Sequence, residues 1–174
     1  MITLEQLRAF VPLGNLTILM GIVEHQEILA HYEITPGRRL QMFMAQVAHE
    51  SAGFRTTREY ASGKAYENRK DLGNTNPGDG VRYKGRGLIQ LTGRFNYRAY
   101  SPALGFDAED RPELLEQMPH ALLIAVLYWH SRGLNKLADE DKFTTITKRI
   151  NGGTNGLQDR LNYLAKAKKI WTPE

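Results

Sequence analysis

The sequence predicts a mostly α-helical fold with two lobes around a substrate cleft, and three observations support this. Apolar residues recur at helical spacing in the first and last thirds of the chain, as at Leu157, Leu161 and Leu164. The stretch Leu72–Gly87 is instead rich in glycine, which interrupts helices. The chain has 174 residues and contains no repeat or long linker. We therefore expect residues 1–174 to form a single domain with two lobes, and no separate second domain.

The order of the helices follows from caps and periodicity. Thr3 and Gln6 match a capping box at the start of the first helix. The apolar spacing predicts further helices over residues 16–29, 40–48, from about 94, 112–118, 121–130, 143–150 and 157–170. The glycine-rich stretch predicts turns or a short hairpin, and few strands are expected.

Several kinds of chemistry are excluded by the residues present. The chain has no cysteine, so it has no disulfide, thiolate metal site or cysteine nucleophile. His49 and Glu50 do not begin a His-Glu-x-x-His zinc motif because residue 53 is glycine. No Gly-x-Ser-x-Gly motif occurs, and "GRGLIQ" lacks the third glycine of a dinucleotide-binding loop. We expect neither a metal nor a cofactor.

The charge balance bears on partners and location. The formal net charge of +4 suits a polyanion, and by charge alone both nucleic acid and bacterial cell wall qualify. The longest apolar run, Ala121–Trp129, is too short to span a bilayer, so stable membrane insertion is not expected. The first residues lack a basic leader and a small-residue cleavage site. Synthesis in the cytoplasm without a signal peptide is therefore expected.

Two glutamates nine residues apart, Glu50 and Glu59, are the candidate chemical pair. In one unbroken helix they would lie on opposite faces, roughly 13 Å apart along the axis. Gly53 is placed to end the helix in a left-handed conformation, with Phe54 packing back on the last turn. Glu50 would then lie half-buried in the final turn, near the negative end of the helix dipole. Burial and dipole both disfavour its charged form, as a general acid requires.

Glu59 follows the expected helix stop and has basic residues around it in the sequence. Arg55, Arg58, Lys64 and Arg69 are expected to keep it ionised, which suits a general base. Two carboxyl groups in contrasting environments can cleave a glycosidic bond. From the spacing alone, a helix-terminal glutamate and a solvated surface glutamate are the simpler interpretation, because most glutamates lie on the surface.

The segment "YKGRGLIQLTGRFNY", residues 83–97, gives a more specific signal than the two glutamates. If it is extended, Gln90 and Thr92 share a polar face, and Ile89 and Leu91 share a buried one. This segment resembles the signature of glycoside hydrolase family 19, the chitinase-type fold shared with bacteriophage endolysins. The resemblance includes "AHESAGF", "INGGTNG" and "QDRLNY" in the family's order, and covers roughly residues 40 to 165. The lack of cysteines and the short glutamate spacing match the compact, phage-type branch.

The resemblance implies a role for each matching residue. It implies that Glu50 is the general acid and Glu59 the general base, and that Thr92 helps to hold the attacking water. The implied substrate-binding residues are Gln90, Asn96, Asn151 and Arg160, and Tyr97 and Arg86 would be structural or cleft-lining groups. Structural roles remain open for three of these: Asn96 as a helix cap, Asn151 in a helix-terminating turn, and Arg160 as a surface charge.

The function implied is that of a peptidoglycan-degrading endolysin with a lysozyme-like and chitinase-like fold. The enzyme would hydrolyse the β-1,4 bond between N-acetylmuramic acid and N-acetylglucosamine with inversion. The alternatives are a chitinase, a lytic transglycosylase and a non-catalytic wall-binding module. The expected partner is a peptidoglycan strand rather than nucleic acid, and the protein is expected to be a monomer. It would act in the periplasm after another protein permeabilises the membrane.

Overall fold

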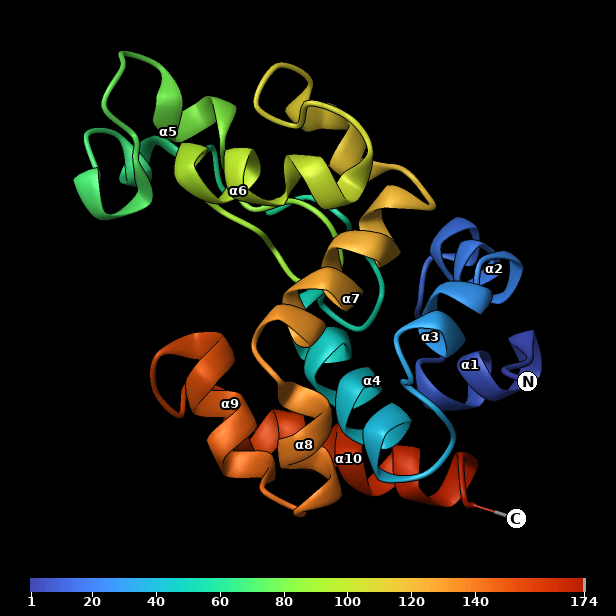
Figure 1. The fold of residues 1–174 in the computed structure, drawn as a ribbon. Coiled ribbons are helices and arrows are strands. Elements are labelled where there is room, and N and C mark those ends of the chain that lie inside the picture. Colours follow the sequence, from blue (N-terminus) through green and yellow to red (C-terminus); the bar gives the residue numbers. More distant parts are fainter. Residues whose placement is uncertain (174) are drawn as a thin grey trace.

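The computed structural model describes residues 1–173 and is built almost entirely of short helices (Figure 1). These are α1 (Leu4–Phe10), α2 (Leu16–Glu24), α3 (Glu27–His31), α4 (Arg38–Glu50), η1 (Lys64–Tyr66), η2 (Lys70–Leu72), α5 (Asp79–Arg82), α6 (Arg94–Leu104), η3 (Pro112–Glu116), α7 (His120–Ser131), α8 (Leu134–Asp139), α9 (Phe143–Asn151) and α10 (Leu157–Ile170). The described residues form no named strand, only two isolated bridges that join Arg86 to Arg58 and to Leu91. The predicted helical fold is confirmed.

Most of the expected boundaries are close to those observed. The capping box of Thr3 and Gln6 is present at the start of α1. The helix expected over 16–29 is instead divided into α2 and α3, because the chain leaves helical geometry at His25. The glycine-rich stretch forms turns around the four-residue helix α5. In residues 1–173 no helix is both long and apolar enough to cross a membrane.

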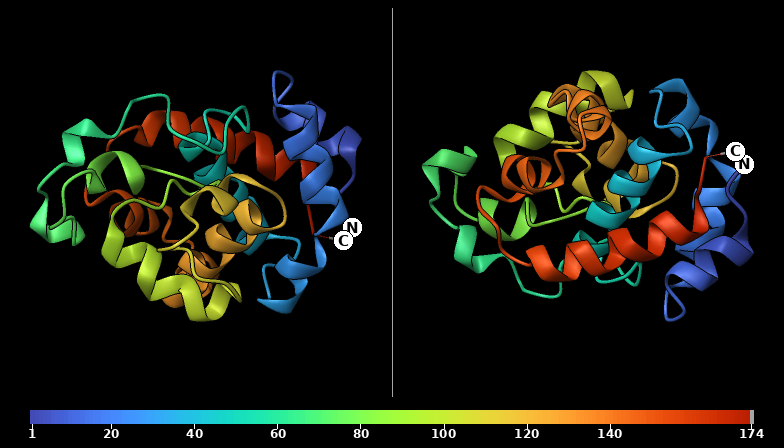
Figure 2. Two further views of the ribbon diagram at one scale, coloured as in Figure 1. Left: turned by 90° about the horizontal axis from the view of Figure 1, so that it is seen from above. Right: turned by 90° about the horizontal axis from the view of Figure 1, so that it is seen from below.

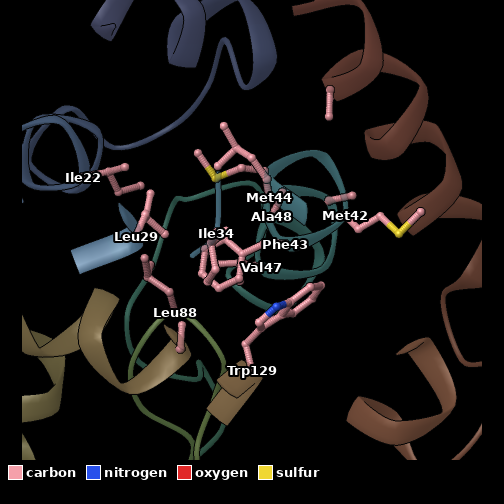
Figure 3. Close-up of a cluster of buried hydrophobic side chains, with 14 of the residues drawn as sticks. Ile22, Leu29, Ile34, Met42, Phe43, Met44, Val47, Ala48, Leu88 and Trp129 are labelled. Carbon is pink, nitrogen blue, oxygen red and sulfur yellow. The ribbon is translucent and has the colours of Figure 1, made fainter. Parts of the chain in front are cut away.

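The larger of two hydrophobic cores surrounds α4 (Figure 3). All residues of this helix from Leu40 to Ala48 are buried, because α7, α8 and α10 pack around it. The ring of Phe43 meets that of Trp129 from α7 edge to face, with 5.5 Å between ring centroids. Burial on all sides fixes the direction in which α4 ends, and therefore the position of Glu50.

A smaller core lies beneath α6. Its buried members are Tyr83, Leu91, Tyr97, Leu104, Ala108, Leu115, Ile124 and Leu127. Helix α7 contributes Ile124 and Leu127 to this core and Trp129 to the larger one. We call the part from η1 to η3 the small lobe and the part formed by α1–α4 and α8–α10 the large lobe. Helix α7 runs between them (Figures 1 and 2).

An ion-pair network holds the small lobe together. Arg94, at the start of α6, binds the buried carboxylate of Asp79 at 2.6 Å and Glu109 at 2.7 Å. Arg98, one turn later, also pairs with Glu109. The hydrogen bond from Arg98, supported by Arg94 and opposed by desolvation, lowers the pKa of Glu109 to about 2. The network ties the glycine-rich segment to the start of α6.

Candidate active site

Helix α4 ends at Glu50, and the chain then turns away sharply. Ala52, Gly53 and Phe54 all have positive φ, at 53°, 74° and 55°. The Gly53 N–H donates to the Ala48 carbonyl at 2.7 Å, and Phe54 is fully buried. The predicted helix stop at Gly53 is confirmed, although Ala52 and Phe54 share its left-handed conformation. Glu50 is half-buried in the last turn, as expected.

A buried arginine binds Glu50 directly. Arg160 of α10 is 1% exposed, and its Nη2 donates to Glu50 Oε1 at 2.7 Å. Its Nη1 donates to Gln46 Oε1 at 2.7 Å, and its Nε to the Asn155 carbonyl at 3.2 Å. Gln46 in turn donates to Thr147 of α9 at 2.8 Å. The alternative of Arg160 as a surface charge is therefore wrong, because three acceptors surround its guanidinium.

In the described structure, this network engages only one of the two oxygens of the Glu50 carboxyl group. Within residues 1–173, the hydrogen bonds to the Glu50 carboxyl involve Oε1 alone. The carboxyl group is thus held by one oxygen and can exchange a proton with a ligand through the other.

Glu59 is held by the small lobe in a different way. Its backbone N–H donates to the Gly85 carbonyl at 3.0 Å, and its Oε1 accepts from the Gly85 N–H at 2.6 Å. Its Oε2 accepts from the Tyr66 hydroxyl at 3.1 Å. Burial, followed by the charge of Glu59, raises the pKa of Tyr66, which therefore stays a proton donor at neutral pH.

The basic residues that lie near Glu59 in the sequence do not form ion pairs with it. Arg58 lies 3.9 Å from Glu116, and Arg69 pairs with Asp71 at 2.6 Å. No lysine or arginine in the described chain forms an ion pair with Glu59. Two of the four expected cations, Arg58 and Arg69, thus pair with other carboxylates, whereas Glu59 turns towards the backbone of Gly85.

Gln90 and Thr92 lie against the same glycine that binds Glu59. A Cβ on Gly85 would lie 3.0 Å from Gln90 Oε1 and 3.4 Å from Thr92 Oγ1. The segment before them is a turn rather than the extended strand that was expected, because Gln90 has a φ of 58°. The expected alternation of faces holds nevertheless, since Ile89 and Leu91 are buried.

The two candidate asparagines come from different lobes. Asn96, in the first turn of α6, donates to the Thr92 carbonyl at 2.8 Å. Asn151 is the last residue of α9, and Gly152 after it takes a left-handed conformation. The Nδ2 of Asn151 is buried and has no hydrogen-bond partner in the described structure. A buried amide nitrogen without a partner is suited to donate to a ligand.

Arg86 and Tyr97 are buried inside the small lobe and do not line an open surface. Arg86 binds Glu116 at 2.9 Å and the Tyr97 hydroxyl at 3.2 Å. The Tyr97 hydroxyl donates to the Lys84 carbonyl, and burial raises the pKa of Tyr97. These two side chains hold the segment that contains Gly85, which is the structural role that the sequence analysis gave as one of their two possible roles.

Sequence reasoning missed two groups at the site. Tyr66 was not singled out because it lies in an unpatterned segment, and only its contact with Glu59 reveals it. Tyr128 of α7 was assigned to a buried helix, yet its hydroxyl donates to the Ile150 carbonyl at 3.3 Å, next to Asn151. Its interruption of the apolar run "ALLIAVLYW" was the only available signal. Residues 1–173 contain no cluster of histidine, aspartate and glutamate that could hold a metal ion.

The structure is helical and two-lobed, and each lobe holds one candidate carboxyl group, Glu50 through Arg160 and Glu59 through Gly85. A family model described as chitinase class I, for glycoside hydrolase family 19, matches residues 30–156. The chain belongs to glycoside hydrolase family 19. It is therefore a glycoside hydrolase, and members of this family act on glycan polymers.

Relatives and solved structures agree with this family. A glycosyl hydrolase family 19 domain-containing protein of Haemophilus influenzae is 35% identical over 150 residues, covering 68% of this chain and 73% of the relative. An endochitinase of Arabidopsis thaliana is 31% identical, covering 83% of this chain and 53% of the relative. This chain thus spans about half the length of that plant enzyme. Chitinase C of Streptomyces griseus shares the fold, with a TM-score of 0.79, 24% identity, and coverage of 98% of this chain and 76% of that one.

Proposed function

We propose that this glycoside hydrolase is an endolysin of the muramidase type, which cleaves the β-1,4 bond between N-acetylmuramic acid and N-acetylglucosamine with inversion. The observation that carries the acid and base roles is the contrast between Glu50 and Glu59. Arg160 holds Glu50 by one oxygen and leaves the other unengaged. Both oxygens of Glu59 accept a hydrogen bond, and each keeps a further lone pair for water.

The proposed reaction is a single displacement. Glu50 donates its proton from Oε2 to the glycosidic oxygen as the bond to the anomeric carbon breaks. Glu59 accepts a proton from a water molecule, held also by Thr92, as this water attacks the opposite face of the sugar. An inverting reaction requires room for the water, so we expect the carboxyl groups to lie roughly 6.5 to 9.5 Å apart.

Sugar binding is assigned to side chains of both lobes. Gln90 and Asn96 belong to the small lobe, and Asn151 to the end of α9 in the large lobe. The unpartnered Asn151 Nδ2 supports this assignment most directly, because an acetamido or hydroxyl oxygen would satisfy it. The action on peptidoglycan is supported by the net charge of +4, which suits an anionic wall.

A chitinase is the second candidate, because the plant relatives and solved neighbours are named chitinases. Digestion of purified peptidoglycan and of chitin oligomers, followed by mass spectrometry of the new chain ends, separates the candidates. Reducing muramic acid ends are expected from the wild type and absent with Glu50→Gln, while the exposed Glu5→Gln serves as the matched control. Products of chitin alone would make the protein a chitinase, and anhydro ends would make it a transglycosylase. No product from either, with binding retained, would identify a wall-binding module.

The inverting step and the route to the wall need separate tests. Proton NMR during early turnover should show the α-anomer as the first product, and a β-anomer would contradict the inverting mechanism. We also propose that the enzyme reaches the wall after another protein opens the membrane. Recovery of the full-length protein from the periplasm of intact cells that lack such a protein would contradict this route.

A further inference from the structure

Arg132, directly after α7, is a fixed cation without an acidic partner. Its guanidinium carbon lies 3.5 Å from the centroid of the Tyr128 ring, and its Nη1 donates to the Tyr100 hydroxyl at 2.7 Å. The described chain has no carboxylate within ion-pair distance of it. Arg94 and Arg160, in contrast, each bind a carboxylate at 2.7 Å. Stacking and one hydrogen bond therefore orient Arg132 while leaving most of its donors for an anion.

This cation lies beside the candidate active site on the large-lobe side. Tyr128, on which it stacks, donates to the carbonyl of Ile150, the residue before Asn151. Burial raises the pKa of Tyr128, the charge of Arg132 lowers it, and the charge of Glu50 adds to the rise. The hydrogen bond to Ile150 thus links the ring on which Arg132 stacks to the end of α9, where Asn151 follows.

Arg132 also contacts the small lobe, through α6. Tyr100, which binds Arg132, is one helical turn after Asn96 and shares its face of α6. Arg132 therefore contacts α6 through Tyr100, one turn after Asn96, and stacks on Tyr128, whose hydroxyl binds the end of α9 at the residue before Asn151.

The chemistry of the two candidate glycans differs at this point. Chitin is neutral, whereas peptidoglycan carries carboxylates, either on the lactyl group of muramic acid or on the stem peptide. A planar guanidinium binds a carboxylate through two parallel hydrogen bonds. We propose that Arg132 binds a carboxylate of the muramic acid unit and makes the enzyme prefer peptidoglycan to chitin. This inference rests on the proposed function and names a specificity-determining residue for it.

The kinetic test compares Arg132→Gln with Arg8→Gln, which removes an exposed arginine of α1 and changes the net charge equally. The substrates are intact peptidoglycan, glycan strands stripped of peptide by an amidase, and chitin hexamers. We expect Arg132→Gln to lower the ratio of kcat/KM on muramic-acid substrates to that on chitin roughly tenfold, the effect of losing one charged hydrogen bond. Arg8→Gln should leave this ratio unchanged.

The pattern of loss identifies the source of the carboxylate. A loss on stripped strands assigns it to the lactyl group, and a loss on intact peptidoglycan alone assigns it to the stem peptide. An equal loss on all three substrates would show a merely structural role and overturn the proposal, as would no loss on any. Arg132→Lys keeps the charge without the planar donors, so it should recover the ratio only in part.

A binding measurement keeps this inference separate from the muramidase assignment. Titration calorimetry would compare stripped strands and intact peptidoglycan fragments binding to Glu50→Gln and to the double variant Glu50→Gln, Arg132→Gln. We expect the second substitution to weaken binding of at least one of them roughly tenfold, with the melting temperature showing that the variant is folded. If the wild type cuts only chitin, the proposed function fails, yet this titration still decides the role of Arg132. If the two variants bind each of the two ligands with equal affinity, the proposed role of Arg132 is refuted.

Discussion

Replacement of Arg160 by methionine tests the buried network behind Glu50. The substitution keeps most of the side-chain volume but removes the donors to Glu50, Gln46 and Asn155. Because the guanidinium is 1% exposed, water cannot replace it without opening the contact between α4 and α10. Breaking a buried charge pair by removing one partner costs about 3 to 5 kcal/mol. For a chain of this size, that corresponds to a fall in melting temperature of roughly 6 to 20 °C.

Urea unfolding followed by circular dichroism would measure this loss, and glycan hydrolysis assays would follow activity. The matched control is Arg39→Met, which breaks an exposed pair with Asp139 and should cost about 1 kcal/mol or less. Only Arg160→Met should also abolish activity, because it frees the Glu50 carboxyl from its orientation. A loss of stability no larger than that of Arg39→Met would refute the reasoning that the network is closed to water.

Three further substitutions test the small lobe. Tyr66→Phe removes the hydroxyl that donates to Glu59, so kcat should fall about twofold to tenfold with little change in the melting temperature. Gly85→Ala places a methyl group 3.0 Å from Gln90 Oε1, and kcat/KM should fall further than stability; unaltered kinetics would contradict this packing. Glu109→Gln removes a carboxylate whose folded pKa of about 2 lies below its ordinary value of 4.5. Its stabilisation is present above pH 4.5 and is lost as the pH falls towards 2, so unfolding free energies of variant and wild type should converge on acidification.

Local features of the fold were predictable because they depend on neighbouring residues. The end of α4 at Glu50 follows from Gly53, since a left-handed residue stops a helix wherever the rest of the chain goes. The alternation of Ile89 and Leu91 with polar neighbours likewise predicted which side chains are buried. The segment was expected to be extended but forms a turn in which Gln90 is left-handed. The alternation of residue types predicts which faces are buried and does not determine the backbone angles.

The partners of the two glutamates could not be derived from patterning. Arg160 is 110 residues away from Glu50, and only the family resemblance placed it near the acid. Two basic residues that lie close to Glu59 in the sequence, Arg58 and Arg69, pair elsewhere in the fold. One of the two partners of Glu59, the N–H of Gly85, has no side chain that a sequence pattern could reveal. Contacts with long sequence separation or with backbone groups are thus the part of the site that only the structure supplies.

The two glutamates are fixed by different cores, and this changes what their spacing in the sequence means. Glu50 is bound by Arg160 in the large lobe, and Glu59 by Gly85 in the small lobe. The distance between their carboxyl groups is therefore set by how each lobe packs on α7 and not by the eight residues that join them. Gly87 shows how tight that packing is, because a Cβ there would lie 2.4 Å from Ile124 of α7. A relative with a longer connection can consequently keep the same separation, provided that α7 and the loop at Gly87 meet in the same way.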